Sequence, residues 1–338
     1  MALHHNVLVI GAGLSGLMAA RMLQDAGRTV RLLDKGRSVG GRMATRRVGD
    51  GKADTGAQFF TVRDAEFDAY VKGWIAQGIV FEWSRGWSDG SLNPARDGHP
   101  RYAVRDGMNA LAKHLSNGLD FAVNVELQSV RRTVTGWQLT DTEGEVYASD
   151  AVVLTAPVPQ SLKLIDNGGV VLPKEARATL DSVQYEPCLV IIAEVNGATG
   201  LPAPGAMQRH NSNLYWIADN ERKGISKTHL LTIQCSGPFS RALWDLHDEE
   251  VVRKVRIDLM PIMGTDAFEI TAAQVKRWRY SRPVSDLPGD YLLVDVADAA
   301  GSTAPLLFVG DAWCGARVEG AFVSGLRGGR ALAEKVGK

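Results

Sequence analysis

The stretch His5–Gly16, HNVLVIGAGLSG, decides the fold of this chain. Its first half is apolar and β-branched enough for a buried parallel strand, and its glycine-rich second half opens a helix that we expect over Leu14–Ala26. Gly11 permits the tight turn, Gly13 lets the backbone approach a phosphate, and Gly16 lets the helix pack closely on the strand. The stretch therefore predicts the first turn of a dinucleotide-binding fold.

An acid ends the next strand, where such a fold needs one. Val30–Leu33 is apolar, and Asp34 follows it, 23 positions after Gly11. A carboxylate at this place accepts hydrogen bonds from ribose hydroxyls, while the free N–H groups at the helix N-terminus face the phosphates. Strand, turn, helix and acid in this order indicate a site for the ADP half of a dinucleotide.

The composition argues against several classes of partner. Of the 338 residues, 45% are hydrophobic and 22% are charged, which is typical of a globular protein with a large core. Lys and Arg together number 38, as do Asp and Glu, so the charge balance favours neither nucleic acid nor an anionic membrane surface. No obligate protein partner is indicated. The apolar run at the N-terminus is too short for a membrane span.

The cysteines and histidines indicate neither a disulfide framework nor a metal site. Cys188, Cys235 and Cys314 are odd in number, widely spaced and without CxxC spacing, which favours a reducing compartment. The adjacent His4 and His5 lead into the first strand, and the other histidines are scattered along the chain. We expect a cytoplasmic protein without a bound metal.

Changes of pattern along the chain indicate two interleaved domains. Strands with alternating polar residues dominate the middle, at Cys188–Val195, Leu214–Ala218 and His229–Cys235, which is typical of an antiparallel sheet. Ser88–Pro100 is rich in Gly, Asn, Pro and Asp and is predicted to be an exposed loop. The predicted class is α/β, with a Rossmann-like parallel-sheet domain interleaved with an antiparallel-sheet substrate domain. We expect the first domain in residues 1–63, 101–165 and 285–338, and the second in residues 64–100 and 166–284.

The C-terminal part returns to the parallel sheet. Pro305–Val309 is a short buried strand, Gly310-Asp311 ends it, and Gly320–Val336 is a helix rich in small residues. A protein that binds only NAD completes its phosphate site in the first βαβ unit and has no special need for Gly40-Gly41-Arg42 or for a terminal Gly-Asp. FAD is longer, and its ribityl chain and isoalloxazine ring need further contacts. The two additional motifs therefore favour FAD.

These motifs resemble those of the flavin-containing amine oxidase superfamily and, within it, the renalase family in its bacterial form. The stretches that carry the resemblance are Asp54–Thr61, Phe308–Trp313 and Val318–Gly325. The match in length and motif order covers essentially the whole chain. The flavin motifs are shared by many oxidases, whereas Gln58-Phe59-Phe60-Thr61 and the compact length favour the renalase family.

The resemblance implies noncovalent FAD in a site assembled from both ends of the chain. In that family Arg42 would neutralise the pyrophosphate, Asp311 would bind the ribityl chain, and the backbone of Val125 would contact adenine. Relatives that attach the flavin covalently use a cysteine before the terminal Gly-Asp, and this chain has none between Cys235 and Gly310. The expected cofactor contacts are Gly11, Ala12, Gly13, Ser15, Gly16, Asp34, Lys35, Gly41, Arg42, Gly56, Ala57, Val125, Asp311 and Val318.

The resemblance also implies a reaction. Renalase-like proteins oxidise the 1,2-dihydro and 1,6-dihydro isomers of NAD(P)H to NAD(P)+ and pass the electrons to O2, which forms H2O2. The nitrogen lone pair of a dihydropyridine expels hydride from C2 or C6 directly to flavin N5, so no general base is required. We therefore predict no catalytic acid or base residue; the protein needs only to stack and orient the ring.

The expected substrate contacts are of three kinds. The backbone of Ala57–Thr61 and the amide of Gln58 would hold a carboxamide, aromatic side chains would form walls, and two arginines would bind phosphates at the entrance. Each kind also has an ordinary interpretation, as core for the aromatic residues and as solvated surface for the arginines. The full set is Ala57, Gln58, Phe59, Phe60, Thr61, Arg96, Tyr185, Trp216, Trp313 and Arg317.

Two other functions stay open at this stage. An amine oxidase or a carotenoid-type desaturase has the same fold, and an amine oxidase would need an aromatic cage for a neutral amine rather than phosphate-binding arginines. A flavin-binding protein without turnover is the other alternative, because FAD binding alone does not prove catalysis.

Overall fold

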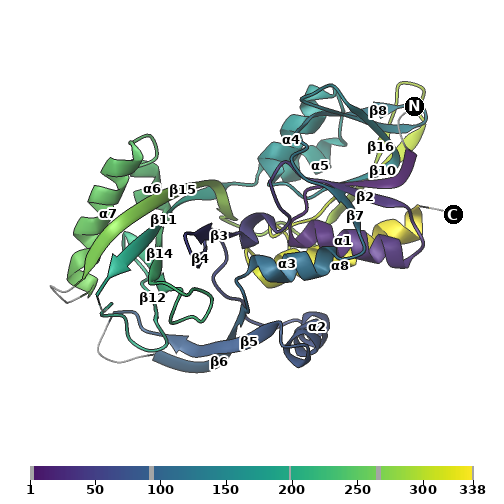
Figure 1. Ribbon diagram of the computed structural model, residues 1–338. Coiled ribbons are helices and arrows are strands. Elements are labelled where there is room, and N and C mark those ends of the chain that lie inside the picture. The colour runs from purple at the N-terminus through teal and green to yellow at the C-terminus, as the bar shows by residue number, and fades with distance from the viewer. Residues whose placement is uncertain (1–3, 91–94, 198, 264–267, 337–338) are drawn as a thin grey trace.

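Two large sheets form the two halves of the molecule. The computed structural model describes residues 4–90, 95–197, 199–263 and 268–336, with the side chains of residues 95–97 also outside the description. An eight-stranded mixed sheet contains strands from both ends of the chain, and a five-stranded antiparallel sheet is built from the middle (Figure 1). The predicted α/β class, a parallel-sheet domain interleaved with an antiparallel one, is confirmed.

The first sheet is parallel at its centre. Its strands are β1 (His4–Ile10), β2 (Val30–Leu33), β7 (Asp120–Ala122), β8 (Leu127–Thr133), β9 (Gly136–Asp141), β10 (Val146–Leu154), β16 (Leu292–Ala297) and β17 (Thr303–Phe308). The parallel strands lie in the order β17-β10-β1-β2-β7, and β16 pairs antiparallel with β17 at one edge. On the side where the second half of β10 pairs with β17, its first half pairs with β9. In this way β10 joins the parallel sheet to the antiparallel strands β8 and β9.

Helices cover both faces of this sheet (Figure 1). On one face lie α1 (Leu14–Asp25), α3 (Asn109–Ser116) and α8 (Val318–Lys335), and on the other lie α4 (Val158–Asn167) and α5 (Lys174–Asp181). Both faces are apolar because Val7 and Val9 pack on the first and Leu8 and Ile10 on the second. No helix of the described residues is long and apolar enough to cross a membrane.

The second sheet presents one face to helices and the other to the rest of the molecule. Its strands, in spatial order, are β12 (Ala206–Gln208), β13 (Leu214–Asp219), β14 (Leu230–Cys235), β11 (Tyr185–Asn196) and β15 (Glu269–Pro283). α6 (Gly237–Ala242) and α7 (Asp248–Met263) cover the outer face (Figure 1). Leu231 and Ile233 of β14 pack in the cluster under α7, so Thr232 and Gln234 between them point the opposite way.

Two hairpins connect the halves. The chain passes from the short 3-10 helix η1 (Gly41–Met43) into β3 (Thr45–Val48) and β4 (Gly51–Asp54), which lie between the two sheets in Figure 1. It continues through α2 (Ala65–Ala76) into β5 (Val80–Trp87) and β6 (Ala95–Val104). The residues that follow β4 are therefore positioned where the parallel and antiparallel sheets meet.

The predicted loop over Ser88–Pro100 is wrong for residues 95–100, which belong to β6; of these, Ala95 and Arg96 pair with Trp87 and Gly86 of β5. Turn-forming residues are tolerated there because the hairpin is irregular: its register shifts twice, and Gly98 has a φ of 80°. Residues 91–94 of the predicted loop lie outside the described residues.

The hydrophobic clusters bear on the domain boundaries, which stay a proposal. Phe67 and Trp74 of α2 pack in the cluster that contains α1 and α8. Leu180 of α5 and the nearby Val183 pack in the cluster on the other face of the parallel sheet. We therefore propose that α2 and the residues up to Val183 belong with the FAD-binding domain, although the sequence predicted them in the substrate domain.

Candidate functional site

The glycine turn after β1 is tightly packed on one side and open on the other. A Cβ on Gly16 would lie 2.0 Å from the carbonyl oxygen of Gly11, whereas a Cβ on Gly13 would meet no atom within 4 Å. Among the described residues, Gly13 caps α1 without a side-chain hydrogen bond, and the first turn of α1 contains no acidic side chain. The first N–H groups of α1 are therefore available to an anion on the open side.

Asp34 lies beside this turn at the end of β2. Its carboxylate accepts hydrogen bonds from the backbone N–H groups of Ala12 and Gly36, both at 2.6 Å. The N–H of Val125 donates to the Asp34 carbonyl oxygen at 2.9 Å. Lys35 forms an exposed ion pair, 3.7 Å long, with the glutamate after Val125. The structure thus brings together Asp34, Lys35 and Val125, three of the expected cofactor contacts.

Arg42 and Asp311, from opposite ends of the chain, form a two-point ion pair. Arg42 Nη1 and Nη2 each lie 2.7 Å from an Asp311 carboxylate oxygen, and the two side chains are 28% and 11% exposed. Burial opposes the charge on the guanidinium, but the carboxylate of Asp311 outweighs it and raises the pKa of Arg42. The N–H of Gly40 donates to the Ala12 carbonyl oxygen at 2.7 Å, which holds this motif against the glycine turn.

Hydrogen bonds to its backbone N–H and carbonyl groups hold the segment 54–58 between the two large sheets. The N–H groups of Thr55 and Ala57 donate to the carbonyls of Ala44 and Arg42, both at 2.9 Å. Three side chains of the antiparallel sheet donate to the carbonyls on the other side. They are Thr232 Oγ1 to Asp54 (2.9 Å), Trp278 Nε1 to Thr55 (2.7 Å) and Gln234 Nε2 to Gly56 (2.7 Å).

Sequence reasoning missed these three donors. Thr232 and Gln234 alternate with buried apolar residues along β14, and that alternation was a usable signal that one face of the strand is polar. Trp278 lies in β15, a strand that the sequence analysis did not predict.

The side-chain amide of Gln58 is buried, and among the described residues hydrogen bonds are found for its nitrogen but not for its oxygen. It is 5% exposed, and its Nε2 donates to the carbonyls of Asp54 (2.7 Å) and Gly56 (3.1 Å). Its Oε1 is buried and has no hydrogen-bond partner in the described structure. A buried acceptor without a donor is costly, so a ligand that donates to Gln58 Oε1 would gain this interaction.

Phe59 and Phe60 belong to different clusters. The ring of Phe59 lies 5.0 Å from Trp87 and 5.3 Å from Trp216, in an aromatic cluster that also contains Trp83. Phe60 is 3% exposed and stacks on a tyrosine of β6 in the core. The ordinary interpretation as core therefore suits Phe60, while Phe59 faces the tryptophans of the substrate domain.

Glu319, which follows Val318 in α8, binds the chain just after Thr61. The carboxylate of Glu319 is buried and accepts hydrogen bonds from the N–H groups of Arg63 (2.5 Å) and Asp64 (2.8 Å). The first turn of α8 is thereby fixed to the chain that follows Thr61. Thr61 also lines a surface groove of about 740 Å³ between the start of α2 and β6.

The aromatic residues expected as substrate walls separate into three environments. The ring of Tyr185 lies 5.6 Å from Tyr280, and burial together with the nearby charge of Asp311 raises the Tyr185 pKa to about 12. Trp216, 1% exposed, lies in the aromatic cluster with Phe59. Trp313 is buried in the cluster between the parallel sheet and α4, so its ordinary interpretation as core is favoured.

Of the two arginines expected at the entrance, the structure describes the side chain of Arg317 but not that of Arg96. The backbone of Arg96 pairs with Gly86 in the β5–β6 hairpin, but its side chain lies outside the described residues. Arg317 is exposed at the N-terminus of α8. It follows Ala316, which lines a surface groove of about 350 Å³ together with Glu186 and residues 282–286.

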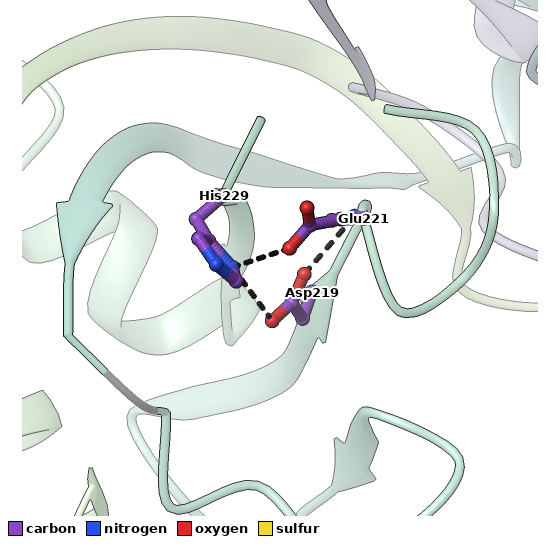
Figure 2. Close-up of side chains that lie close together, drawn as sticks. All are labelled: Asp219, Glu221 and His229. Carbon is purple, nitrogen blue, oxygen red and sulfur yellow. Dashed lines mark hydrogen bonds and ion pairs between the residues drawn. The ribbon is translucent and has the colours of Figure 1, made fainter. Parts of the chain in front are cut away.

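A cluster that the sequence did not predict lies at the turn after β13. His229 Nδ1 is 2.6 Å from Glu221 Oε2 and 3.9 Å from Asp219 Oδ2 (Figure 2). The Asp219 carboxylate is buried, and its Oδ1 accepts the N–H groups of Glu221 (3.0 Å) and Arg222 (3.2 Å). Because Asp219 is engaged in holding the turn, we interpret the cluster as a turn with a surface ion pair and not as a set of metal ligands.

The described residues fit a bound FAD. The open N-terminus of α1 suits a diphosphate, and the hydrogen bond from Gly40 to Ala12 holds the motif of the charged Arg42 against the same glycine turn. The fold and the site together define a flavoenzyme with a nucleotide-binding parallel-sheet half and a separate antiparallel sheet. The chain belongs to the flavin containing amine oxidoreductase family, whose model matches residues 81–333. A model of the NAD(P)-binding Rossmann-like domain matches residues 9–72.

Known proteins similar to the chain agree with this assignment. Renalase from Mus musculus is 25% identical over 308 residues, which are 85% of this chain and 89% of that protein. Putrescine oxidase from Kocuria rosea is 41% identical over 70 residues, 21% of this chain and 15% of that protein. A solved structure of wild-type putrescine oxidase bound to putrescine has the same fold, with a TM-score of 0.71 and 15% identity over 99% of both chains. The predicted resemblance and the FAD cofactor are confirmed, and the chain is a flavin-dependent oxidoreductase.

Proposed function

We propose that this flavoenzyme oxidises 1,2-dihydro and 1,6-dihydro isomers of NAD(P)H to NAD(P)+, with O2 reduced to H2O2. The observation that carries the proposal is the buried, unpartnered Oε1 of Gln58, because a nicotinamide carboxamide has an NH2 group that can donate to it. The similarity to renalase along 85% of the chain supports the same substrate class. Bound FAD supplies the hydride acceptor for this chemistry.

The residues of the site have the task of orienting the substrate. The segment 54–58 is held on both sides by hydrogen bonds, so Ala57 and Gln58 present a rigid edge to a planar ring. Oxidation of a dihydropyridine produces an aromatic cation and needs no proton transfer to a side chain. The two buried ionisable groups next to this segment, Asp54 and Lys223, are paired with each other, as are Arg42 and Asp311, which suits such a reaction.

We also propose that the FAD is bound noncovalently. Cys314 is the cysteine close to Asp311 in sequence, and its Sγ lies 3.4 Å from a carboxylate oxygen of Asp290. Burial and this acidic neighbour raise the Cys314 pKa to about 12. A thiol that stays protonated at neutral pH is a poor nucleophile toward the flavin.

Arg317 is our candidate for binding the substrate's phosphates. Its exposed guanidinium stands at the N-terminus of α8, beside the groove that Ala316 lines. The Arg282 side chain in the same groove already pairs with Glu186, at 2.7 and 2.9 Å. Arg96 stays a second candidate from the sequence alone.

An amine oxidase is the second candidate function. Tyr185 and Tyr280 form an aromatic pair with an interplanar angle of 81°, close enough to Asp311 and Arg42 for their charges to shift the Tyr185 pKa. A neutral amine can pack against the faces of such a pair.

Anaerobic mixing separates these functions. We expect the dihydropyridine isomers to bleach the flavin absorption of the purified protein, and ordinary NADH and a panel of amines that includes putrescine to leave it unchanged. Bleaching by amines alone would support the second function. A flavin that no donor reduces would favour a binding protein without turnover.

A further inference from the structure

Lys223 is a buried cation that the proposed chemistry does not use. Its side chain is 0% exposed, and its Nζ lies 2.6 Å from Asp54 Oδ2 and 2.6 Å from the carbonyl oxygen of Gln58. The same Nζ lies 4.7 Å from the centre of the Trp83 ring. Asp54 is also 0% exposed. One ammonium group therefore contacts both ends of the segment 54–58 and the aromatic cluster around Phe59.

Burying an ammonium group costs desolvation free energy, so its position indicates a structural or functional role. Burial lowers the pKa of Lys223, and the charge of Asp54 opposes this effect. A buried ion pair contributes little net stability compared with apolar residues of the same volume. It does fix geometry, because an ammonium group held by a carboxylate, a carbonyl and an aromatic face has few alternative positions.

The turn that carries Lys223 is itself rigid. Asp219 accepts the N–H groups of Glu221 and Arg222 through its side chain and the N–H of Lys223 through its carbonyl, the last at 2.9 Å. Asn220 Oδ1, from the same turn, accepts the N–H of Asp54 at 3.3 Å. The turn after β13 therefore holds the segment 54–58 from the substrate-domain side.

We propose that Lys223 is a positioning residue that holds Ala57 and Gln58 in the geometry needed for hydride transfer. The inference rests on the proposed function in that it places the substrate ring beside Ala57 and Gln58. Lys223 bonds to both Asp54 and Gln58, which lie four positions apart. The backbone between them therefore has little freedom to shift. The side chain acts through this segment and needs no contact with substrate or flavin.

Lys223 should affect how the substrate is oriented but not how tightly FAD binds. The groups that we assign to the diphosphate are the N-terminus of α1 and the guanidinium of Arg42, and Lys223 bonds to neither. Loss of Lys223 should therefore leave the diphosphate contacts of FAD in place and disturb the segment 54–58, which we place beside both the flavin and the substrate. A shift of about 1 Å in a reacting group is enough to slow a reaction about 100-fold.

The test compares Lys223→Met with three other variants. Lys227→Met is the matched control, because Lys227 is exposed on the same connection between β13 and β14. Arg42→Met is the positive control for loss of FAD. Asp54→Asn combined with Lys223→Met removes the unpaired carboxylate, restores charge balance and carries the test if the single variant does not fold.

Four quantities are measured for each variant. They are the apoprotein's FAD Kd, from flavin fluorescence; the visible band shape of the bound flavin; the unfolding temperature; and the rate constant of flavin reduction at saturating substrate. For K223M we expect a Kd within threefold of the wild type, an altered band shape and a reduction rate about 100-fold lower. The double variant should recover unfolding temperature but not reduction rate.

Distinct results would overturn the inference. A wild-type reduction rate in K223M would show that the segment is held without Lys223. Recovery of the rate together with the unfolding temperature in the double variant would assign Lys223 a structural role only. If wild-type protein is reduced by an amine and not by dihydropyridines, the proposed function fails, and the same comparison is made with that amine. An unchanged band shape and an unchanged amine reduction rate in K223M would then refute the positioning role separately.

Discussion

Replacing Gly13 with alanine should strongly weaken FAD binding while leaving the apoprotein folded. A Cβ at Gly13 meets no atom of the described structure within 4 Å, and the backbone there, with φ −73° and ψ 177°, is open to alanine. Loss of a glycine N-cap should cost the helix at most about 1 kcal/mol. The new methyl group instead occupies the open side of the turn, where we place the diphosphate.

The loss of affinity follows from the hydrogen bonds at stake. A hydrogen bond to a charged group contributes about 1.5–3 kcal/mol, and a methyl group at Gly13 should disrupt one or two of them. A loss of about 3 kcal/mol corresponds to roughly a 100-fold higher Kd. The assay titrates apoprotein with FAD and follows flavin fluorescence, with thermal unfolding of the apoprotein measured in parallel.

Gly73 provides the matched control for this experiment. It lies inside α2, and a Cβ there also meets no atom within 4 Å. Gly73→Ala should stabilise the helix by up to about 1 kcal/mol and leave the FAD Kd unchanged. An FAD Kd for G13A within threefold of the wild type would refute the assignment of the diphosphate to this turn. So would a loss of apoprotein stability large enough to account for the weaker binding.

Three further predictions follow from the ionisable groups. Arg42→Met should lower the free energy of unfolding by about 3 kcal/mol, because it leaves the Asp311 carboxylate, 11% exposed, without its partner; denaturant unfolding measures this, and R42M/D311N should recover part of the loss. Acid precipitation should release free FAD into the supernatant, since Cys314, with a pKa of about 12, stays protonated and unattached to flavin; yellow colour retained in the pellet would contradict this. The Tyr185 pKa is raised from 10.0 to about 12, so its contribution to stability is fully present below pH 10 and is lost as the pH rises toward 12. Tyr185→Phe should flatten the stability curve in that range, and a curve as steep as that of the wild type would refute the assignment.

The nucleotide half of the site was predictable because its signals are local. Gly13 and Asp34 are separated by one helix and one strand, and each element has a distinct periodicity. Arg42 and Asp311 lie far apart in sequence, yet both belong to motifs whose residues are contiguous. Their pairing at 2.7 Å was not predicted, because the resemblance assigned them to different parts of the cofactor.

The substrate half was less predictable because side-chain direction matters there more than composition. Phe59 and Phe60 are adjacent and identical in type, but one faces the tryptophans and the other the core. The aromatic walls were chosen by residue type alone, which cannot distinguish Trp216 from Trp313. Arg317 was predicted at the start of the last helix, and it directly precedes α8; its binding of phosphate stays a prediction.

The sequence by itself determined the βαβ unit, the acid after the second strand and the return of the chain to the parallel sheet. These features are set by spacing and hydrophobic periodicity among neighbouring residues, which physical chemistry restricts strongly. Only the tertiary structure decided what holds the segment 54–58. Lys223 and Thr232 reach it across 165 and 178 positions of the chain. A slip of one residue in the register of β14 would turn Thr232 and Gln234 to the opposite face of the sheet.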